Sequence, residues 1–136
     1  MEVSQISLDL LIHSTSLTNV YLCPTPVLPG HILIAPKSRV RNLFQLSEDE
    51  TSDLFRIILR INNILENEYQ CSSLTLDLKD GVYNHLFFSL IPRKFNDLEE
   101  NDEIYSLLEK MELVQENSGL NQKAEELRKI MIHCEA

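Results

Sequence analysis

The sequence predicts an α+β domain in which a mainly antiparallel sheet packs against one long helix, with further helices at the C-terminal end. Residues 72–79 alternate between apolar and polar side chains, residues 85–91 are almost all apolar, and Asp80-Gly81 supplies a turn between them. Ser47-Glu-Asp-Glu50 is a capping box that begins a long amphipathic helix. Strand patterns lie on both sides of this helix, which favours α+β over an alternating parallel architecture.

Length, charge and cysteine usage exclude several classes of protein. The 136 residues fit a single domain over 1–136, in which we expect residues 1–6 and 114–122 to be flexible. A net charge of −9 argues against nucleic-acid and anionic-membrane partners, and no apolar run reaches membrane-spanning length. The three cysteines form neither a disulfide framework nor a zinc motif, so we expect no metal, no cofactor and a reducing intracellular location, cytoplasm and/or nucleus.

The first third of the chain predicts strands separated by a rigid loop. Ile6–Leu22 is apolar and hydroxyl-rich and is broken by Ser-Thr-Ser, which indicates two short strands around a turn. Three prolines and Gly30 make Cys23–Gly30 a loop, because proline removes a backbone donor and fixes φ. His31–Ala35 is then expected to be a strand with His31 at its start.

The helix that begins after Ser47 is expected to end near Tyr69. Its apolar residues cover an arc of about 220°, whereas a helix on one sheet needs an apolar stripe of only about 100°. Either the C-terminal segment or a partner subunit must cover the additional arc. The candidates for a subunit interface are the apolar side chains Phe55, Ile57, Leu59 and Ile64.

The segment Asp80–Lys94 is expected to contain the central strand of the domain. Alternation places Leu86, Phe88 and Leu90 on one face, which we assign to the core. The opposite face carries His85, Phe87, Ser89 and Ile91. Beyond Lys94, a polar loop, a short helix around Ile104 and a last amphipathic helix over Gln122–Glu135 are expected.

These segments resemble the histidine triad (HIT) family, and in particular its fragile-histidine-triad (Fhit) branch. The family's signature strand has the pattern His-x-His-x-His-x-x, followed in this branch by Pro-Arg-Lys. Five blocks match in order, namely Pro26–Pro36, Leu46–Phe55, Ser73–Gly81, Ile91–Lys94 and Asn101–Tyr105. The resemblance covers nearly the whole chain and implies a HIT-like fold.

The triad itself is degenerate in this sequence. His85 matches the first histidine, whereas Phe87 occupies the nucleophile's position and Ser89 that of the third histidine. The family's enzymes form a covalent nucleotidyl-histidine, and a phenyl ring has no lone pair with which to attack phosphorus. The resemblance therefore implies no catalytic residue and a catalytically inactive HIT-fold pseudoenzyme.

The nucleotide-contacting positions of the family also differ here. The ribose-contacting asparagine corresponds to Cys23 and the phosphate-holding glutamine to Lys79, while the connection before His85 is several residues shorter. A relic nucleotide site would consist of His31, Lys79, His85 and Ser89. His31, His85 and Lys79 also have ordinary structural explanations, as locally bonded histidines and a solvated lysine.

Two hypotheses follow. In the first, the chain is an interaction or structural subunit, either a homodimer or bound to a protein partner in a larger complex. In the second, it is a residual nucleotide-binding or dinucleoside polyphosphate-processing protein with a rearranged site. Titration with nucleotides separates the two hypotheses, because a ligand of the native state must raise its stability.

Overall fold

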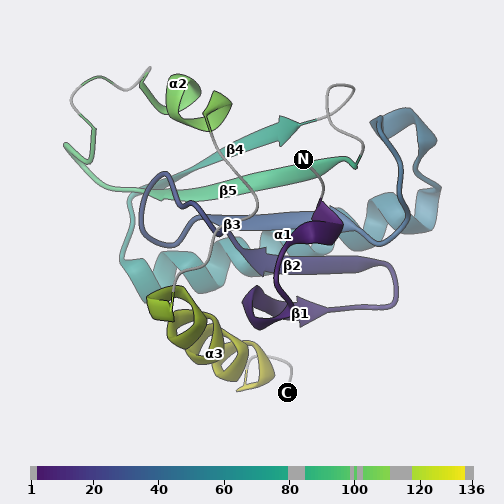
Figure 1. Ribbon diagram of the computed structural model, residues 1–136, viewed down its shortest axis with the longest axis horizontal. Helices are drawn as coiled ribbons and strands as arrows, with labels where there is room; N and C mark the ends of the chain where they lie inside the picture. Colours follow the sequence, from purple (N-terminus) through teal and green to yellow (C-terminus); the bar gives the residue numbers. More distant parts are fainter. Residues whose placement is uncertain (1–2, 80–84, 99, 101–102, 111–117, 134–136) are drawn as a thin grey trace.

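The computed structural model describes residues 3–79, 85–98, 100, 103–110 and 118–133 (Figure 1). It confirms the α+β class, with a five-stranded antiparallel sheet and three α-helices within those ranges. The elements in chain order are η1 (Val3–Gln5), η2 (Leu8–Leu10), β1 (Leu11–Ser14), β2 (Thr18–Leu22), β3 (Ile32–Pro36), η3 (Leu43–Gln45), α1 (Glu48–Tyr69), β4 (Ser73–Lys79), β5 (Phe87–Arg93), α2 (Glu103–Glu109) and α3 (Ser118–His133).

The strand order is β1-β2-β3-β5-β4, and every neighbouring pair is antiparallel. The expected hairpin of β4 and β5 is present, although its turn at residues 80–84 lies outside the described ranges. All seven residues of β5 are buried, as a strand covered on both faces requires. β5 lies between β3 and β4, and β4 forms one edge of the sheet.

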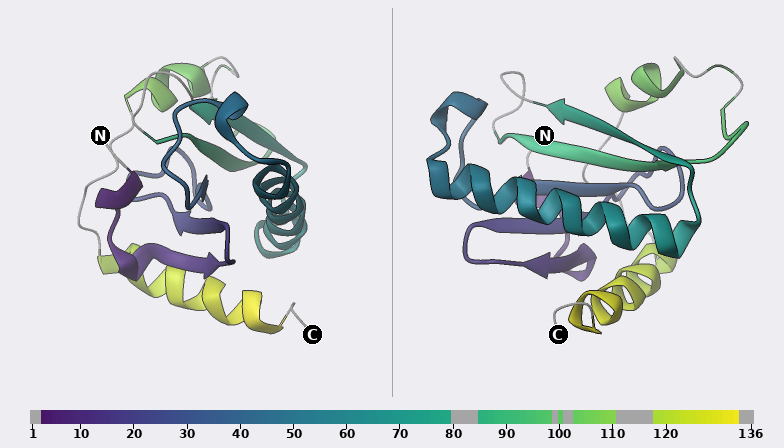
Figure 2. Two further views of the ribbon diagram at one scale, coloured as in Figure 1. Left: turned by 90° about the vertical axis from the view of Figure 1, so that its right-hand side faces the viewer. Right: turned by 180° about the vertical axis from the view of Figure 1, so that it is seen from behind.

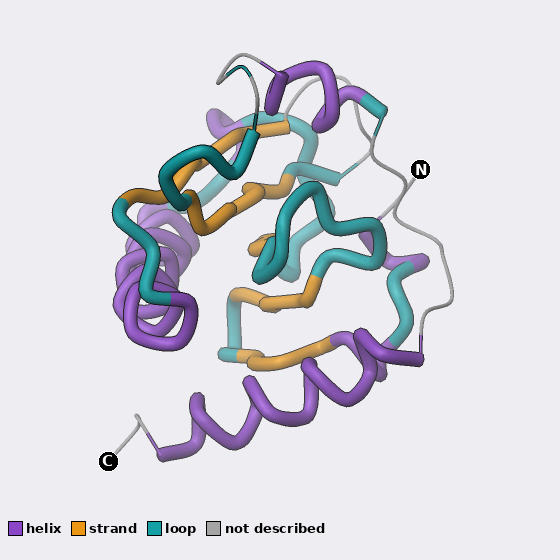
Figure 3. The backbone as a smooth tube through the Cα atoms, turned by 90° about the vertical axis from the view of Figure 1, so that its left-hand side faces the viewer, coloured by secondary structure: helices purple, strands orange, loops and turns teal. Residues whose placement is uncertain are grey.

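The helices divide between the two faces of the sheet and its β1 side. Figure 2 shows α1 along one face, and Figure 3 shows the N-terminal elements and α2 on the other side of the sheet from α1. α3 runs beside β1 and contacts β1, β2 and η2. Arg128 fixes it there by donating to the carbonyl oxygens of Asp9 and Leu11 at 3.0 and 2.9 Å.

α1 begins where the capping box predicts. The backbone N–H of Glu50 donates to Ser47 Oγ at 3.1 Å, and the N–H of Ser47 donates back to the Glu50 carboxylate at 2.9 Å. The helix ends at Gln70, which adopts a left-handed conformation with φ of 49°. One turn into the helix, Asp53 accepts hydrogen bonds from Thr15 and Thr18, both at 2.6 Å, which ties α1 to the β1–β2 turn.

The wide apolar arc of α1 is covered only in part. Ile57 and Ile64 are 2% and 7% exposed, so their assignment to a subunit interface is wrong, because they pack into the chain's own core. Phe55 and Leu59 remain 40% and 66% exposed. The C-terminal helix touches α1 through polar contacts, including Arg60 Nη2 to the carbonyl of Met131 at 3.1 Å.

Two boundaries differ from those expected. The first strand starts at Leu11, because residues 3–5 and 8–10 form 3₁₀ turns whose apolar side chains Val3, Ile6 and Leu10 are buried. The last helix starts at Ser118, within the segment 114–122 that was expected to be flexible. Across the described parts of the chain, no helix combines the length and apolar character needed to cross a bilayer.

Candidate functional site

The degenerate triad positions lie on the sheet face opposite α1. Phe88 points toward α1, where its ring meets that of Phe55 edge to face at 5.7 Å between centroids. Alternation therefore directs Phe87 and Ser89 away from α1. We call this surface of the sheet the triad face. It is covered by α2, the loop that follows β2, and η1, whose Val3 belongs to the same buried cluster as Phe87.

Phe87 has no exposed surface and fills the position of the nucleophile. His85 lies just before the strand and is 8% exposed, with its Nε2 atom 2.6 Å from the carbonyl oxygen of Pro36. Because a carbonyl only accepts, Nε2 carries the proton in this contact. Burial lowers the pKa of His85, with the bond to Pro36 opposing this shift and the charge of Arg39 adding to it.

His31 is the second histidine of the triad face. It extends the ladder of β3, since Cys23 N–H donates to its carbonyl at 2.9 Å, and alternation places its ring on the same face as Leu33. The N–H of Val27 donates to His31 Nδ1 at 3.2 Å, so the neutral ring carries its proton on Nε2. Complete burial lowers the pKa of His31 to about 3, and the ring is neutral at physiological pH.

Three buried polar atoms have no hydrogen-bond partner within the described residues, and all three belong to one region of the triad face. They are His31 Nε2, Ser89 Oγ and Asp77 Oδ2. The register places Ser89 directly between Leu33 of β3 and Asp77 of β4. His31 and Ser89 are fully buried, and unpaired groups in such positions cost free energy unless a ligand or water satisfies them.

Asp77 was not singled out by the sequence analysis. Alternation along β4 correctly placed it with Lys79 on the face opposite the leucines, but only the pairing register brings it opposite Ser89. Lys79 lies opposite Phe87, and its Nζ is 3.4 Å from Asp77 Oδ2, an ion pair without hydrogen-bond geometry. Both of these side chains are 19% exposed and form the accessible side of the group.

Cys23, which the resemblance aligns with a ribose-contacting asparagine, is also fully buried. Burial raises the pKa of its thiol to about 12, so no thiolate forms at physiological pH and the side chain is not a nucleophile. Within the ranges that the structure describes, no three histidine, cysteine or acidic residues form a group that could hold a metal ion.

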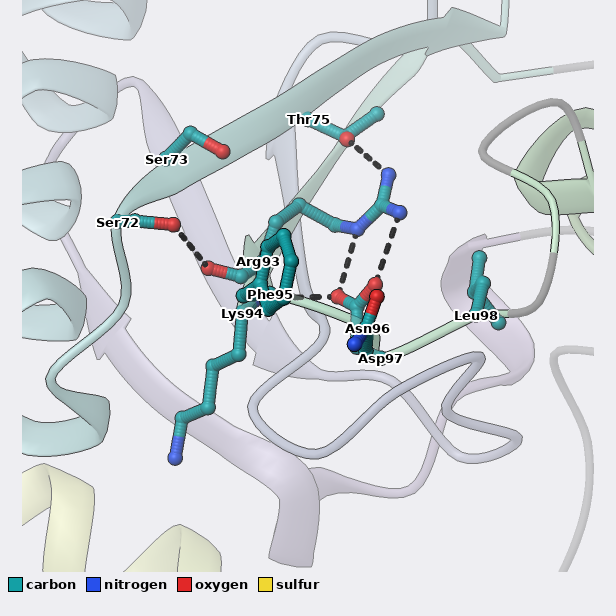
Figure 4. Close-up of a pocket in the computed structure, with 9 residues that line it drawn as sticks. All are labelled: Ser72, Ser73, Thr75, Arg93, Lys94, Phe95, Asn96, Asp97 and Leu98. Atoms are coloured by element: carbon teal, nitrogen blue, oxygen red, sulfur yellow. Dashed lines mark hydrogen bonds and ion pairs between the residues drawn. The ribbon is translucent and has the colours of Figure 1, made fainter.

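A hollow of about 480 Å³ lies at the other end of β5 and differs in character from the triad face (Figure 4). Arg93 occupies it, with Nε and Nη2 donating to Asp97 at 2.8 and 3.0 Å and Nη1 donating to Thr75 at 3.1 Å. The guanidinium holds the pKa of Asp97 at about 2. Because Arg93 and Asp97 already satisfy each other here, whereas the triad face holds buried polar atoms without hydrogen-bond partners in the described ranges, we assign the functional site to the triad face instead.

The triad face offers binding groups and lacks a covalent nucleophile. His31 supplies one N–H donor, the Ser89 hydroxyl can donate and accept, and the Asp77 carboxylate accepts. The only lysine in the group, Lys79, is paired with Asp77, so the four side chains have no net charge when the histidine is neutral. Such a set can recognise a polar ligand through hydrogen bonds.

Comparison with known proteins identifies relatives of this chain. A family model described as "HIT domain" matches residues 8–94. The bifunctional bis(5'-adenosyl)-triphosphatase/adenylylsulfatase FHIT of Arabidopsis thaliana is 36% identical over 105 residues, which are 74% of this chain and 58% of the relative. The asymmetrical bis(5'-nucleosyl)-tetraphosphatase of Schizosaccharomyces pombe is 34% identical with the same two coverages. The bis(5'-adenosyl)-triphosphatase of Dictyostelium discoideum is 33% identical over 108 residues, 76% of this chain and 72% of the relative.

Solved structures confirm the fold expected from the resemblance. The NitFhit protein of Caenorhabditis elegans superposes with a TM-score of 0.76 at 26% identity, over 93% of this chain and 28% of that one. The Plasmodium falciparum diadenosine triphosphate hydrolase gives a TM-score of 0.74 at 18% identity, over 94% of this chain and 80% of that one. The chain spans somewhat more than half the length of the first two sequence relatives, at 58% of each.

These relatives contradict the expectation that the chain is a catalytically inactive interaction subunit. The three sequence relatives are named as enzymes that act on dinucleoside polyphosphates. The comparison therefore favours the second hypothesis, in which the chain binds or processes nucleotides at a rearranged site. Under this second hypothesis, Phe87 and Ser89 affect the mechanism of the site and do not by themselves make the chain inactive.

Proposed function

This chain belongs to the HIT family, and we propose that it binds nucleotides and processes dinucleoside polyphosphates at a rearranged site on its triad face. The observation that carries the proposal is that the buried atoms His31 Nε2 and Ser89 Oγ have no hydrogen-bond partner among the described residues and lie on the same face as the Asp77–Lys79 ion pair. Unpaired polar atoms destabilise a core, so a sequence that retains them at the family's binding face favours a ligand there. The names of the relatives support a dinucleoside polyphosphate as that ligand.

The proposed reaction cannot use a covalent intermediate at residue 87. Phe87 has no lone pair, so a water molecule must attack the phosphorus atom directly. The water oxygen forms the new bond to phosphorus, the bridging oxygen leaves with the electron pair of the broken anhydride bond, and the water's proton is released to solvent. Loss of a covalent nucleophile costs orders of magnitude in rate, so we expect turnover to be at least about 10³-fold slower than with a histidine nucleophile.

Two measurements test this proposal together. Thermal shift with AMP and diadenosine triphosphate at millimolar concentration should raise the melting temperature, because these ligands bind the native state. Mass spectrometry of the acid-quenched reaction should find slowly formed nucleotide products and no nucleotidyl adduct on the protein. Absence of any stabilisation by both nucleotides overturns the proposed binding, and a covalent adduct overturns the proposed route.

We further propose that the chain forms a homodimer through the edge of β4. β4 is the end strand of the sheet, and an edge strand can pair antiparallel with its own copy about a two-fold axis. Two exposed apolar side chains are joined beside this edge, because Leu76 pairs with Leu90 next to Phe88, and the Phe88 ring contacts Phe55. Leu59 lies one helical turn after Phe55 on the same face of α1. Leu76, Phe55 and Leu59 are 47%, 40% and 66% exposed, which gives the edge an apolar border on the α1 side.

Light scattering coupled to gel filtration tests the dimer. The wild-type chain should have twice the monomer mass, and Leu59→Glu should shift it to the monomer because a charge is placed on the apolar border. Ile132→Glu is the matched control, since Ile132 is 69% exposed on α3, away from β4. A monomeric wild type, or a dimer unaffected by Leu59→Glu, contradicts this arrangement.

A further inference from the structure

Ser89 and Asp77 form a directly opposed cross-strand pair on the triad face. In antiparallel strands, the Cβ atoms of directly opposite residues are about 4.5 to 5.5 Å apart. The two side chains make no hydrogen bond with each other, although each has a buried oxygen without a hydrogen-bond partner among the residues that the structure describes, that of Asp77 lying 3.4 Å from Lys79 Nζ. A ligand hydroxyl placed between these two side chains would donate to the carboxylate and accept from the serine.

His31 extends this pair across a third strand. Leu33 lies opposite Ser89, and His31 is two residues before Leu33 on the same face, so His31 and Ser89 are diagonal neighbours. The His31 Nε2–H is directed by the bond from Val27 to Nδ1, which fixes the tautomer. The group therefore presents an N–H donor, a hydroxyl and a carboxylate acceptor from three adjacent strands.

The charges of this group suit a sugar better than a phosphate. Recognition of phosphate relies on unpaired cations or on a helix N-terminus. Here His31 is neutral, Asp77 would repel a phosphate, and the single positive side chain, Lys79, is already paired with Asp77. Carboxylates in nucleotide-binding proteins accept hydrogen bonds from ribose hydroxyls.

We propose that Asp77, Ser89 and His31 form a site for the ribose cis-diol of a ribonucleoside. This inference deepens the proposed function and rests on it, because it assigns the ligand's sugar to the triad face. In this assignment the Asp77 carboxylate accepts from the two hydroxyls, while Ser89 and His31 donate to their oxygens. It also replaces the ribose contact that the buried thiol of Cys23 cannot make.

Access to the site is limited by the layer above it. Asp77 and Lys79 are partly exposed, whereas Ser89 and His31 have no exposed surface. A ligand must approach from the β4 side and displace part of the covering layer before it reaches the two buried donors. Association should accordingly be slower than for an open site of the same affinity.

Calorimetric titration of the full chain with adenosine and with 2',3'-dideoxyadenosine tests the proposal. Each hydrogen bond to a charged group corresponds to about a tenfold or larger change in affinity, so adenosine should bind at least about tenfold more tightly. Asp77→Asn should reduce this ratio to less than about threefold. Asp49→Asn is the matched control, because it removes the same charge from an exposed position in the first turn of α1 and should leave the ratio unchanged.

Ser89→Ala provides a second variant that does not depend on Asp77, and it should weaken adenosine with little effect on the dideoxy analogue. Equal affinity of the two nucleosides for the wild type overturns the ribose assignment, and then a trapped water satisfies the three atoms. In that case binding of AMP or diadenosine triphosphate still upholds the proposed function. Absence of binding by the nucleosides and the nucleotides alike overturns both.

Discussion

Lowering the pH from 7.5 to 5 should destabilise the protein through His31. Burial lowers the pKa of this ring from 6.5 to about 3, so between these values the unfolded chain binds a proton that the native state does not. The contribution of the neutral His31 ring to the free energy of unfolding is therefore fully present above pH 6.5 and is lost as the pH falls toward 3. At pH 5 the loss amounts to about 2 kcal/mol, from about 1.5 units of pH at 1.36 kcal/mol each.

Urea denaturation at pH 7.5, 6.5, 5.5 and 5.0 measures this effect. His31→Asn retains an acceptor for the Val27 N–H and removes the titrating ring, so its stability should depend much less on pH, although its absolute stability should fall. The pKa of His85 is also lowered, so the stability of His31→Asn should retain part of its dependence on pH. His13→Asn is the control, because it removes an imidazole from a partly exposed position on β1 instead of a fully buried one. A flat wild-type profile, or an unchanged slope in His31→Asn, refutes the reasoning.

Two further pairs of substitutions test the packing of the chain. Ser89→Ala should change the free energy of unfolding by less than about 1 kcal/mol in the ligand-free protein, because its hydroxyl is unpaired, whereas Thr18→Val should cost about 1 to 3 kcal/mol through the lost bond to Asp53. Equal losses in urea denaturation would contradict the assignment of an unpaired hydroxyl. Gly30→Ala should destabilise by about 1 to 3 kcal/mol, because φ is +86° and the new Cβ would lie 2.8 Å from a tyrosine ring. Gly119→Ala, in the exposed first turn of α3, should instead be neutral or stabilising in the same thermal melts.

Local sequence signals predicted the central elements well. The capping box fixed the start of α1 at Ser47, and the proline-glycine loop placed the strand that follows His31 to within one residue. The N-terminal 3₁₀ turns were missed, because Ile6–Leu22 has the composition of strands and short 3₁₀ segments carry little periodicity. The start of α3 was placed too late, since Gly119 and Asn121 read as a linker although the helix includes them.

The site was predicted only in part for a similar reason. Alternation correctly assigned Phe87 and Ser89 to one face and the leucines of β4 to the other. Alternation cannot give the pairing register, which depends on the turn, and so the contact of Asp77 with the triad face was not predicted. The inference of inactivity followed from the lost histidines at Phe87 and Ser89 and from the changed binding positions, whereas the relatives and the buried polar atoms without hydrogen-bond partners in the described part of the chain both favour a ligand.

Titration of diadenosine triphosphate by calorimetry, with the wild-type chain and with Ser89→Ala, addresses the nucleotide site most directly. We predict saturable binding at one site per chain for the wild type and at least about tenfold weaker binding for the variant, which removes the buried hydroxyl without adding volume. An absence of binding at millimolar ligand, or equal affinity of the two proteins, would contradict a nucleotide site on this face of the sheet.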